Sequence, residues 1–350
     1  MKHLFLIIIA GILIWLSACS PTQMEQQNQT DNDTKTNQEN VQHTKNVYSL
    51  FYNEKDFSYQ VFHNDKKQTS FRVLSGEKPV AADIFANDFY VLFSGFNKDS
   101  AANNSVIMKN GKPIIFFNKG FLAVDFCVKG CNFYVLGIVD DSIAVFKNGS
   151  KRLVMPKGGL NPLKISVQDD DNIFFALESN GNSQIYKQGE LLYSYDGQCE
   201  GLQSSNSSLY AMVSNKIYCD GKIFMEGGNN YDFLKKQLSA TPTCFATSDR
   251  YCYIGVDSKL ETNGHTLAGI FRYREPYITI KPDDKALGKS DLQSQCCAIS
   301  ACNNGVYYAT INYKSNGRKL NNIHYHFNTE EIFSINIPDE TTKLLYIKGY

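Results

Sequence analysis

A pattern of about 43 residues recurs through most of the chain, and it constrains the fold more than any other feature. Each copy begins with a short apolar run that contains an aromatic residue. From Tyr48 in the first run to Tyr307 in the seventh there are 259 residues and six intervals. Such a period is typical of folds built from stacked supersecondary units. The seven runs are Val47–Leu50, Phe89–Leu92, Phe133–Leu136, Ile173–Ala176, Leu209–Met212, Cys252–Gly255 and Val306–Ala309.

Tight-turn dipeptides follow these runs at a regular distance. The clearest are Asn110-Gly111, Asn148-Gly149 and Asp220-Gly221, each between two apolar runs. This pattern predicts β-hairpins, because both central residues of the turn need a positive φ. A further short strand follows each turn, and one more short strand precedes each aromatic run, which gives four strands per unit. No stretch has the 3.6-residue period of an amphipathic helix, and 21 Tyr and 23 Phe favour strands.

A unit of four strands and about 43 residues resembles a blade of the β-propeller superfamily. The first unit lacks its innermost strand, whereas the segment Lys343–Gly349 at the other end of the chain resembles one. We therefore predict an all-β fold: a single β-propeller over residues 46–350 with about seven four-stranded blades. The C-terminal strand closes the first blade, which removes the exposed sheet edges. Insertions near the end leave six blades as an alternative. The Trp-dependent motifs of known propeller subfamilies are absent, since the one Trp is Trp15.

The first nineteen residues have the pattern of an export signal. A basic start is followed by an apolar run over residues 4–16 and by small residues before Cys19. The run is short for a membrane span of about 20 residues. The segment Leu16–Cys19 resembles the lipobox of bacterial lipoproteins, which implies that residues 1–18 are removed and Cys19 is acylated. An ordinary signal peptide is the alternative. Residues 19–45 are polar and are predicted to form a disordered tether.

The residue next to the acylated cysteine bears on localisation. In the lipoprotein family, Ser20 at this position favours the outer membrane of the cell envelope; the side of that membrane stays open. Lys plus Arg equals Asp plus Glu at 35 each, so nothing in the charge favours a nucleic acid. We expect the membrane as a partner, through the lipid anchor, and an unknown protein or glycan ligand.

Motifs of catalysis are missing. There is no Ser/His/Asp order, no phosphate-binding loop and no Cys-x-x-Cys pair. His324 and His326 alternate on one predicted strand and are interpreted as sheet residues rather than metal ligands. We therefore assign no catalytic residue, cofactor or metal.

Long connections fall on one predicted face of the ring. Because binding residues concentrate on loops held by a rigid scaffold, this face is the candidate binding face. The residues there with the strongest contact character are Asn230, Tyr231, Asp232, Phe233, Tyr313 and Lys314.

Carboxylates also fall on or beside the predicted innermost strands. Asp83, Asp125, Asp169 and Glu200 are candidates for the central channel, where they would hold a cation or a polyol. The simpler interpretation is that a water-filled axis accepts polar residues.

Nine cysteines follow Cys19. Disulfides persist in exported proteins. Cys127 and Cys131 flank one predicted turn, and Cys244 and Cys252 flank the equivalent turn of a later unit. If the members of each pair oppose each other in a hairpin, both pairs are possible disulfides. Packing as small buried side chains is the alternative.

These observations favour an envelope-anchored lipoprotein that acts as a non-enzymatic binding module through its loop-rich face. The alternatives are a periplasmic scaffold for outer-membrane assembly and an envelope glycan hydrolase or lyase that uses the channel carboxylates.

Overall fold

The computed structural model describes the chain from residue 46 to residue 349 with gaps. The described ranges are 46–72, 77–85, 88–97, 102–117, 119–205, 208–227, 230–233, 236–248, 251–259, 266–272, 275–280, 292–302, 304–314, 319–337 and 342–349. The predicted signal peptide, the predicted acylation site Cys19 and the predicted tether lie outside them. Within these ranges, none of the chain forms a helix with the length and hydrophobicity needed to cross a membrane.

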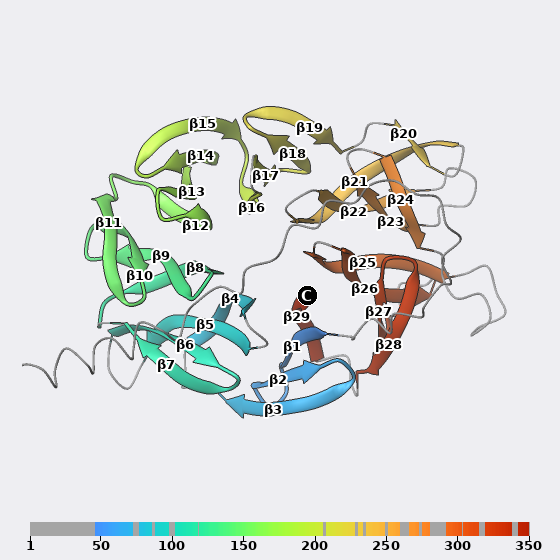
Figure 1. The fold of residues 1–350 in the computed structure, drawn as a ribbon, viewed down its shortest axis with the longest axis horizontal. Coiled ribbons are helices and arrows are strands. Elements are labelled where there is room, and N and C mark those ends of the chain that lie inside the picture. The colour runs from blue at the N-terminus through green and yellow to red at the C-terminus, as the bar shows by residue number, and fades with distance from the viewer. Residues whose placement is uncertain are drawn as a thin grey trace, which may run out of the picture. The chain divides into compact units, whose positions relative to one another are not determined.

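Seven antiparallel sheets surround a common axis and form a β-propeller (Figure 1). The innermost strand of each sheet contacts the innermost strand of the next, and these contacts form a closed ring: β29, β4, β8, β12, β16, β21, β25 and back to β29. Seven blades are therefore confirmed, and the six-bladed alternative is wrong.

The first four blades each have four strands, from the axis outward. Blade 1 has β29 (Thr342–Gly349), β1 (Val47–Asn53), β2 (Ser58–His63) and β3 (Lys66–Arg72). Blade 2 has β4 (Glu77–Phe85), β5 (Asp88–Asn97), β6 (Ala102–Lys109) and β7 (Lys112–Phe116). Blade 3 has β8 (Leu122–Lys129), β9 (Asn132–Val139), β10 (Ser142–Lys147) and β11 (Ser150–Pro156). Blade 4 has β12 (Asn161–Asp169), β13 (Asn172–Ser179), β14 (Asn182–Lys187) and β15 (Glu190–Asp196).

The remaining blades follow the same order, and blade 6 carries one additional strand. Blade 5 has β16 (Cys199–Ser204), β17 (Leu209–Val213), β18 (Lys216–Cys219) and β19 (Lys222–Glu226). Blade 6 has β21 (Lys236–Thr247), β22 (Cys252–Lys259), β23 (Thr266–Arg272) and β24 (Glu275–Ile280), with β20 (Asn230–Phe233) paired to the start of β21. Blade 7 has β25 (Leu292–Cys302), β26 (Gly305–Lys314), β27 (Lys319–Phe327) and β28 (Glu330–Asn336).

The two ends of the propeller meet in blade 1. Strand β29 pairs antiparallel with β1, and the register places Ile347 opposite Ser49 and Tyr346 opposite Leu50. The predicted closure by the C-terminal strand is confirmed. The seven predicted apolar runs all lie on the second strand of a blade, the strand that is buried between neighbouring sheets.

The turns between the two outer strands have the predicted conformation. In blade 2 the turn residues Asn110 and Gly111 have φ angles of 49° and 82°. The Asn110 side chain also accepts a hydrogen bond from the Phe89 backbone N–H at 2.9 Å. Asn148 and Asp220 accept the same bond in blades 3 and 5. One turn residue thus fixes both the hairpin and the start of the blade's second strand.

Packing between adjacent sheets forms the core. One cluster, for example, joins Leu136 and Ile143 of blade 3 to Ile165 and Phe175 of blade 4. Each of these side chains is at most 4% exposed. Burying such a side chain stabilises the fold by about 1.5–3 kcal/mol, so the sheet-to-sheet contacts dominate the stability of the ring.

The predicted long loops are in part strands, which corrects the sequence interpretation. Residues 230–233 form β20, which pairs with β21 so that Tyr231 lies opposite Leu238. Tyr313 and Lys314 end β26 and pair with Gln293 and Leu292 of β25. The insertions therefore lengthen hairpins. Period-2 alternation continues through them, and the paired backbone satisfies its own hydrogen bonds. The side chains of the six candidate contact residues lie outside the described part of the chain.

Candidate functional site in the central channel

Each innermost strand contains a β-bulge at the same place. The register skips one residue on the innermost strand in every blade, so two residues there oppose one on the second strand. A bulge bends the strand and redirects the side chains beyond it. The third residue after the bulge residue lies opposite the aromatic residue of the repeat. In blade 2, for example, the bulge residue is Val80 and Asp83 lies opposite Tyr90. These third residues are Lys348, Asp83, Cys127, Ser166, Gln203, Ala246 and Ser300.

A cavity of about 630 Å³ lies where the seven innermost strands meet. A volume of this size is typical of small-ligand sites. Its lining combines both signs of charge with amide and hydroxyl groups. The charged and amide side chains in the lining are Asp83, Asp125, Lys129, Lys164, Glu200, Gln203 and Lys348.

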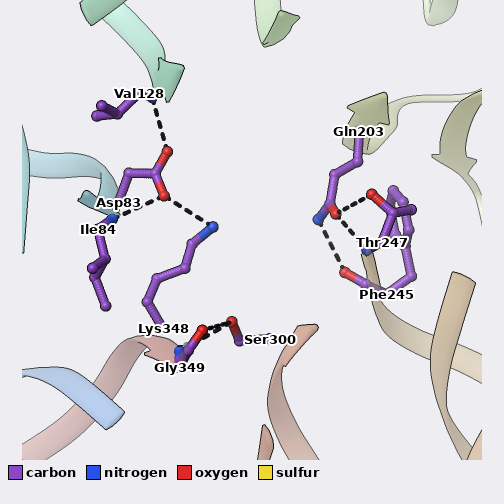
Figure 2. A network of polar contacts seen from close by, with 9 residues as sticks. All are labelled: Asp83, Ile84, Val128, Gln203, Phe245, Thr247, Ser300, Lys348 and Gly349. Carbon is purple, nitrogen blue, oxygen red and sulfur yellow. Dashed lines mark hydrogen bonds and ion pairs between the residues drawn. The ribbon is translucent and has the colours of Figure 1, made fainter. Parts of the chain in front are cut away.

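Asp83 joins three blades. Its Oδ2 accepts a hydrogen bond of 2.8 Å from the Val128 N–H of blade 3, and its Oδ1 accepts one of 2.9 Å from the Ile84 N–H (Figure 2). Lys348 of blade 1 reaches the same carboxylate, with Nζ 3.2 Å from Oδ1. The charge of Asp83 raises the pKa of the Lys348 ammonium. The Asp83 carboxylate therefore contacts one ammonium and two backbone N–H donors.

Gln203 joins blades 5 and 6 through both ends of its amide. The side-chain oxygen accepts a bond of 2.8 Å from the Thr247 N–H and one of 3.2 Å from the Thr247 hydroxyl (Figure 2). Its Nε2 donates to the Phe245 carbonyl oxygen at 3.1 Å. The amide thus continues the hydrogen bonding of the next innermost strand.

Two serines make the same connection at other junctions. Ser166 of blade 4 accepts a bond of 2.7 Å from the Ser204 N–H of blade 5. Ser300 of blade 7 accepts one of 3.1 Å from the Gly349 N–H of blade 1 (Figure 2). The rule is common to Asp83, Gln203 and both serines: the third residue after the bulge accepts from the backbone N–H of the fourth residue in the next blade. We call this contact the interblade hydrogen bond.

Asp125 lies two positions nearer the bulge than these residues, on β8. It is 8% exposed, and its Oδ2 accepts a bond of 2.9 Å from the Ile165 N–H of blade 4. Burial raises the pKa of this carboxyl group to about 6, against the opposing effects of Lys164 and the N–H donors. Asp125 is therefore a buried acid that titrates near neutral pH.

The four predicted channel carboxylates separate into two groups. Asp83, Asp125 and Glu200 line the cavity. Asp169 lies instead at the end of β12, where its carboxylate accepts a bond of 2.9 Å from the Asp171 N–H and bonds from the Asn172 side chain. The Asn172 side chain lowers the pKa of Asp169. A second irregularity of β12, between Val167 and Asp169, places this residue at the turn.

The predicted hairpin register of the cysteines is wrong. In blade 3, Lys129 pairs with Asn132, so Cys131 lies in the turn and Cys127 lies opposite Tyr134. In blade 6, Cys252 lies opposite Thr247 and Cys244 lies opposite Gly255. Symmetry of the sequence about Lys129 and Ser248 suggested opposition, but the pairing of Lys129 with Asn132 sets the first register and the pairing of Thr247 with Cys252 sets the second. Neither predicted pair consists of opposing residues.

The two histidines of β27 have different partners. His324 Nδ1 lies 3.0 Å from a Glu331 carboxylate oxygen. His326 stacks on Tyr308 and hydrogen-bonds Thr310, and burial lowers its pKa to about 4. No group of three or more His, Cys, Asp or Glu side chains suited to a metal ion is found within the described ranges.

Four residues that line the channel were not predicted from the sequence: Ser166, Gln203, Ser300 and Lys348. Their signal is positional: in blades 2 to 7 the third residue after the bulge precedes the aromatic residue of the repeat by seven or eight positions, as Asp83 precedes Tyr90. Residue type alone could not reveal the set, because a carboxylate, an amide and a hydroxyl all accept the same hydrogen bond.

Comparisons with known proteins found distant structural similarities and no family. No protein-family model matches the chain, and no curated protein matches its sequence. Among solved structures, BBS1N in complex with ARL6DN is similar at 12% identity and a TM-score of 0.47, over 77% of this chain and 84% of that one. The dihydro-heme d1 dehydrogenase NirN is similar at 10% identity and a TM-score of 0.47, over 85% of this chain and 64% of that one. The β-propeller domain of the Trilobed protease from Pyrococcus furiosus has 9% identity and a TM-score of 0.42, over 76% and 97%. The fold of this chain, read from its own strand order, is that of a seven-bladed β-propeller.

Proposed function

We propose that the chain is an envelope-anchored lipoprotein whose propeller is a non-enzymatic binding module, with a small polar ligand, such as a glycan fragment, in the central channel. The observation that carries the proposal is the cavity of about 630 Å³ with hydroxyl, amide and charged side chains on its wall. Polyhydroxylated ligands are recognised by groups of this kind, which fix orientation through hydrogen bonds.

The state of the channel carboxylates favours binding over hydrolysis. A glycosidase needs two carboxyl groups that are free to act on the scissile bond from either side. Asp83 is engaged by Lys348 and two N–H groups, and Asp125 is buried and accepts from Ile165. Both carboxylates therefore serve the connection between blades.

Titration of the purified full chain with chito-oligosaccharides tests the binding role. We expect saturable heat release in calorimetry, and we expect Lys164→Met, which removes a charge from the cavity wall, to weaken binding about tenfold or more. Lys151→Met on the outer strand β11 is the matched control and leaves the affinity unchanged. Equal affinities of the Lys164 variant and the parent would place the ligand elsewhere.

A hydrolase or lyase remains the second candidate, because one observation favours it: the raised pKa of Asp125 beside the cavity. Incubation of the full chain with the same oligosaccharides and analysis of the products distinguishes the two functions. Product formation that Asp125→Asn abolishes would replace the binding proposal with the enzymatic one.

The lipid anchor is tested separately. The segment Leu16–Cys19 supports acylation at Cys19. Metabolic labelling with a fatty acid is expected to mark the parent chain and to leave Cys19→Ser unmarked and released from the membrane fraction. Protease treatment of intact cells then decides between a surface-exposed binder and a periplasmic scaffold.

The lengthened hairpins are the second part of the proposed binding surface. Residues 230–233 add the strand β20 to blade 6, and residues 313–314 form the end of β26 in blade 7. Tyr231→Ala and Tyr313→Ala are expected to reduce recovery of a protein partner from solubilised envelope without affecting binding of small oligosaccharides.

A further inference from the structure

At the junction between blades 6 and 7, an alanine occupies the position from which Asp83, Ser166, Gln203 and Ser300 accept their interblade hydrogen bonds. The third residue after its bulge is Ala246, which offers no side-chain acceptor for an interblade hydrogen bond. Two thiols lie at this junction instead: Sγ of Cys244 on β21 is 3.9 Å from Sγ of Cys296 on β25. The Asp257 carboxylate of β22 also reaches this junction and accepts from the Cys296 N–H. The two sulfur atoms thus face each other across a blade boundary.

Space for both sulfur atoms is provided by Gly255. This residue lies opposite Cys244 in the register of β21 and β22. A Cβ atom at Gly255 would lie 2.5 Å from the Cys244 sulfur and 3.2 Å from the Cys296 sulfur, the first of which is too close for any side chain. The corresponding positions of the other six blades carry larger residues. They are Leu50, Leu92, Leu136, Ala176, Met212 and Ala309.

The two thiols differ in access. Cys244 is among the residues that line the channel cavity, whereas Cys296 is 2% exposed and lies behind it. Their protonation differs as well. The hydrogen bond from Cys296 lowers the pKa of Cys244, and Cys244 together with burial raises the pKa of Cys296. Cys244 is therefore the thiol that a molecule in the channel meets first and the one that ionises more readily.

We propose that Cys244 and Cys296 are a thiol–disulfide modification site whose oxidised form is a disulfide between blades 6 and 7. The bond is a covalent counterpart of the interblade hydrogen bonds at four other junctions. The proposal is independent of the ligand assigned to the channel.

The oxidant is a small-molecule disulfide that enters the channel. The Cys244 thiolate attacks one sulfur of this disulfide, which breaks the S–S bond, releases one thiol of the oxidant and leaves a mixed disulfide on Cys244. The Cys296 thiolate then attacks the Cys244 sulfur and releases the second thiol. Two protons and two electrons pass from the cysteines to the oxidant, and the sulfur atoms move together from 3.9 Å to about 2.05 Å.

Pairing of Cys244 with Cys252, as the sequence suggested, is disfavoured by the register. Cys252 lies opposite Thr247, three residues along β21 from Cys244. At about 3.3 Å per residue, the two cysteines are about 10 Å apart along the strand. A disulfide joins Cα atoms no more than about 7 Å apart.

Peptide mapping of the oxidised protein tests the site. The purified full chain is reduced, incubated with oxidised glutathione, alkylated and digested without reductant. Mass spectrometry is expected to find one peptide pair linked through Cys244 and Cys296. The link persists in the control Cys252→Ser and is lost in Cys244→Ser. We expect oxidation to raise the melting temperature of the parent by about 5 °C and to leave that of Cys244→Ser unchanged.

The map of the parent chain decides the question even if a variant fails to fold. Alkylation of both Cys244 and Cys296 after oxidation would overturn the proposal. So would a linked peptide that joins Cys244 to Cys252, or Cys296 to Cys297.

Discussion

Adjacent blades are joined by different side chains at the junctions 4–5 and 5–6 than at the junction 6–7. At the first two, Ser166 and Gln203 accept hydrogen bonds from the next innermost strand. At the last, Ala246 cannot, and two sulfur atoms lie in contact nearby. A hydrogen bond contributes about 1 kcal/mol regardless of redox conditions, whereas a thiol pair becomes strong only when oxidised. The ring thus has permanent polar junctions and one whose strength depends on its surroundings.

Removal of the strongest polar junction should have the largest effect. Asp83→Ala leaves the Lys348 ammonium and the Val128 N–H without their acceptor. We expect the free energy of unfolding to fall by about 2–3 kcal/mol, since the charge-assisted hydrogen bonds of Asp83 are lost while the Lys348 side chain stays partly solvated. Urea denaturation measures the loss, and Asp83→Asn, which keeps the acceptor but not the charge, should lose less. Equal stability of Asp83→Ala and the parent would show that the polar junctions do not hold the ring.

The pH dependence of stability tests the buried acid of the polar region. The pKa of Asp125 is about 6 in the folded chain and 3.8 as its ordinary value, so the folded state binds more protons between these values. The free energy of unfolding should therefore fall as pH rises from about 4 to about 6, by on the order of 2–3 kcal/mol, and then level off.

Substitution separates this acid from a second one. The pKa of Asp257 is also raised to about 6 by burial. Because both carboxyl groups have a pKa of about 6, Asp125→Asn should remove about half of the slope and the double variant with Asp257→Asn nearly all of it. A slope that persists in the double variant would assign the pH dependence to other groups.

Loss of the amide at the junction of blades 5 and 6 should have a smaller effect. Gln203→Ala removes bonds to Thr247 and Phe245. We expect a decrease of about 2 kcal/mol in urea denaturation. Gln203→Glu keeps an acceptor for the Thr247 N–H, so its free energy of unfolding should lie between those of the parent and Gln203→Ala. A decrease below about 0.5 kcal/mol would indicate that water replaces the amide.

An added acceptor at the thiol junction should have the smallest effect and the opposite sign. Ala246→Ser places a hydroxyl at the position of Ser166 and Ser300, facing the backbone N–H of Ala301. Stability of the reduced protein is expected to rise by about 0.5–1 kcal/mol. A decrease would mean that the neighbouring sulfur atoms already fill the space.

Much of the fold could be predicted from the sequence because its signals are local. The repeat of aromatic runs predicts the strands, and the dipeptide Asn110-Gly111 predicts a turn. The innermost strand of the first blade could be recognised in residues 343–349. The lengthened hairpins of blades 6 and 7 were not predicted, since a sequence rich in polar residues resembles a loop.

The site could be predicted only in part. Asp83, Asp125 and Glu200 were identified by their charge and line the cavity. The thiol pair was not, because Cys244 and Cys296 lie in different blades and their approach depends on how two sheets pack. A bulge, which has no sequence signature of its own, also shifted every position after it on the innermost strands.

The pairing of β1 with β29 has a consequence for the order of folding. These strands are separated by nearly the whole propeller, and their pairing carries a high loop-closure cost. During synthesis β1 keeps one unpaired edge until the last residues of the chain become available. The final blade to be completed is then the first to be made, and until that moment its bare edge is the part of the nascent protein most exposed to mispairing with other chains.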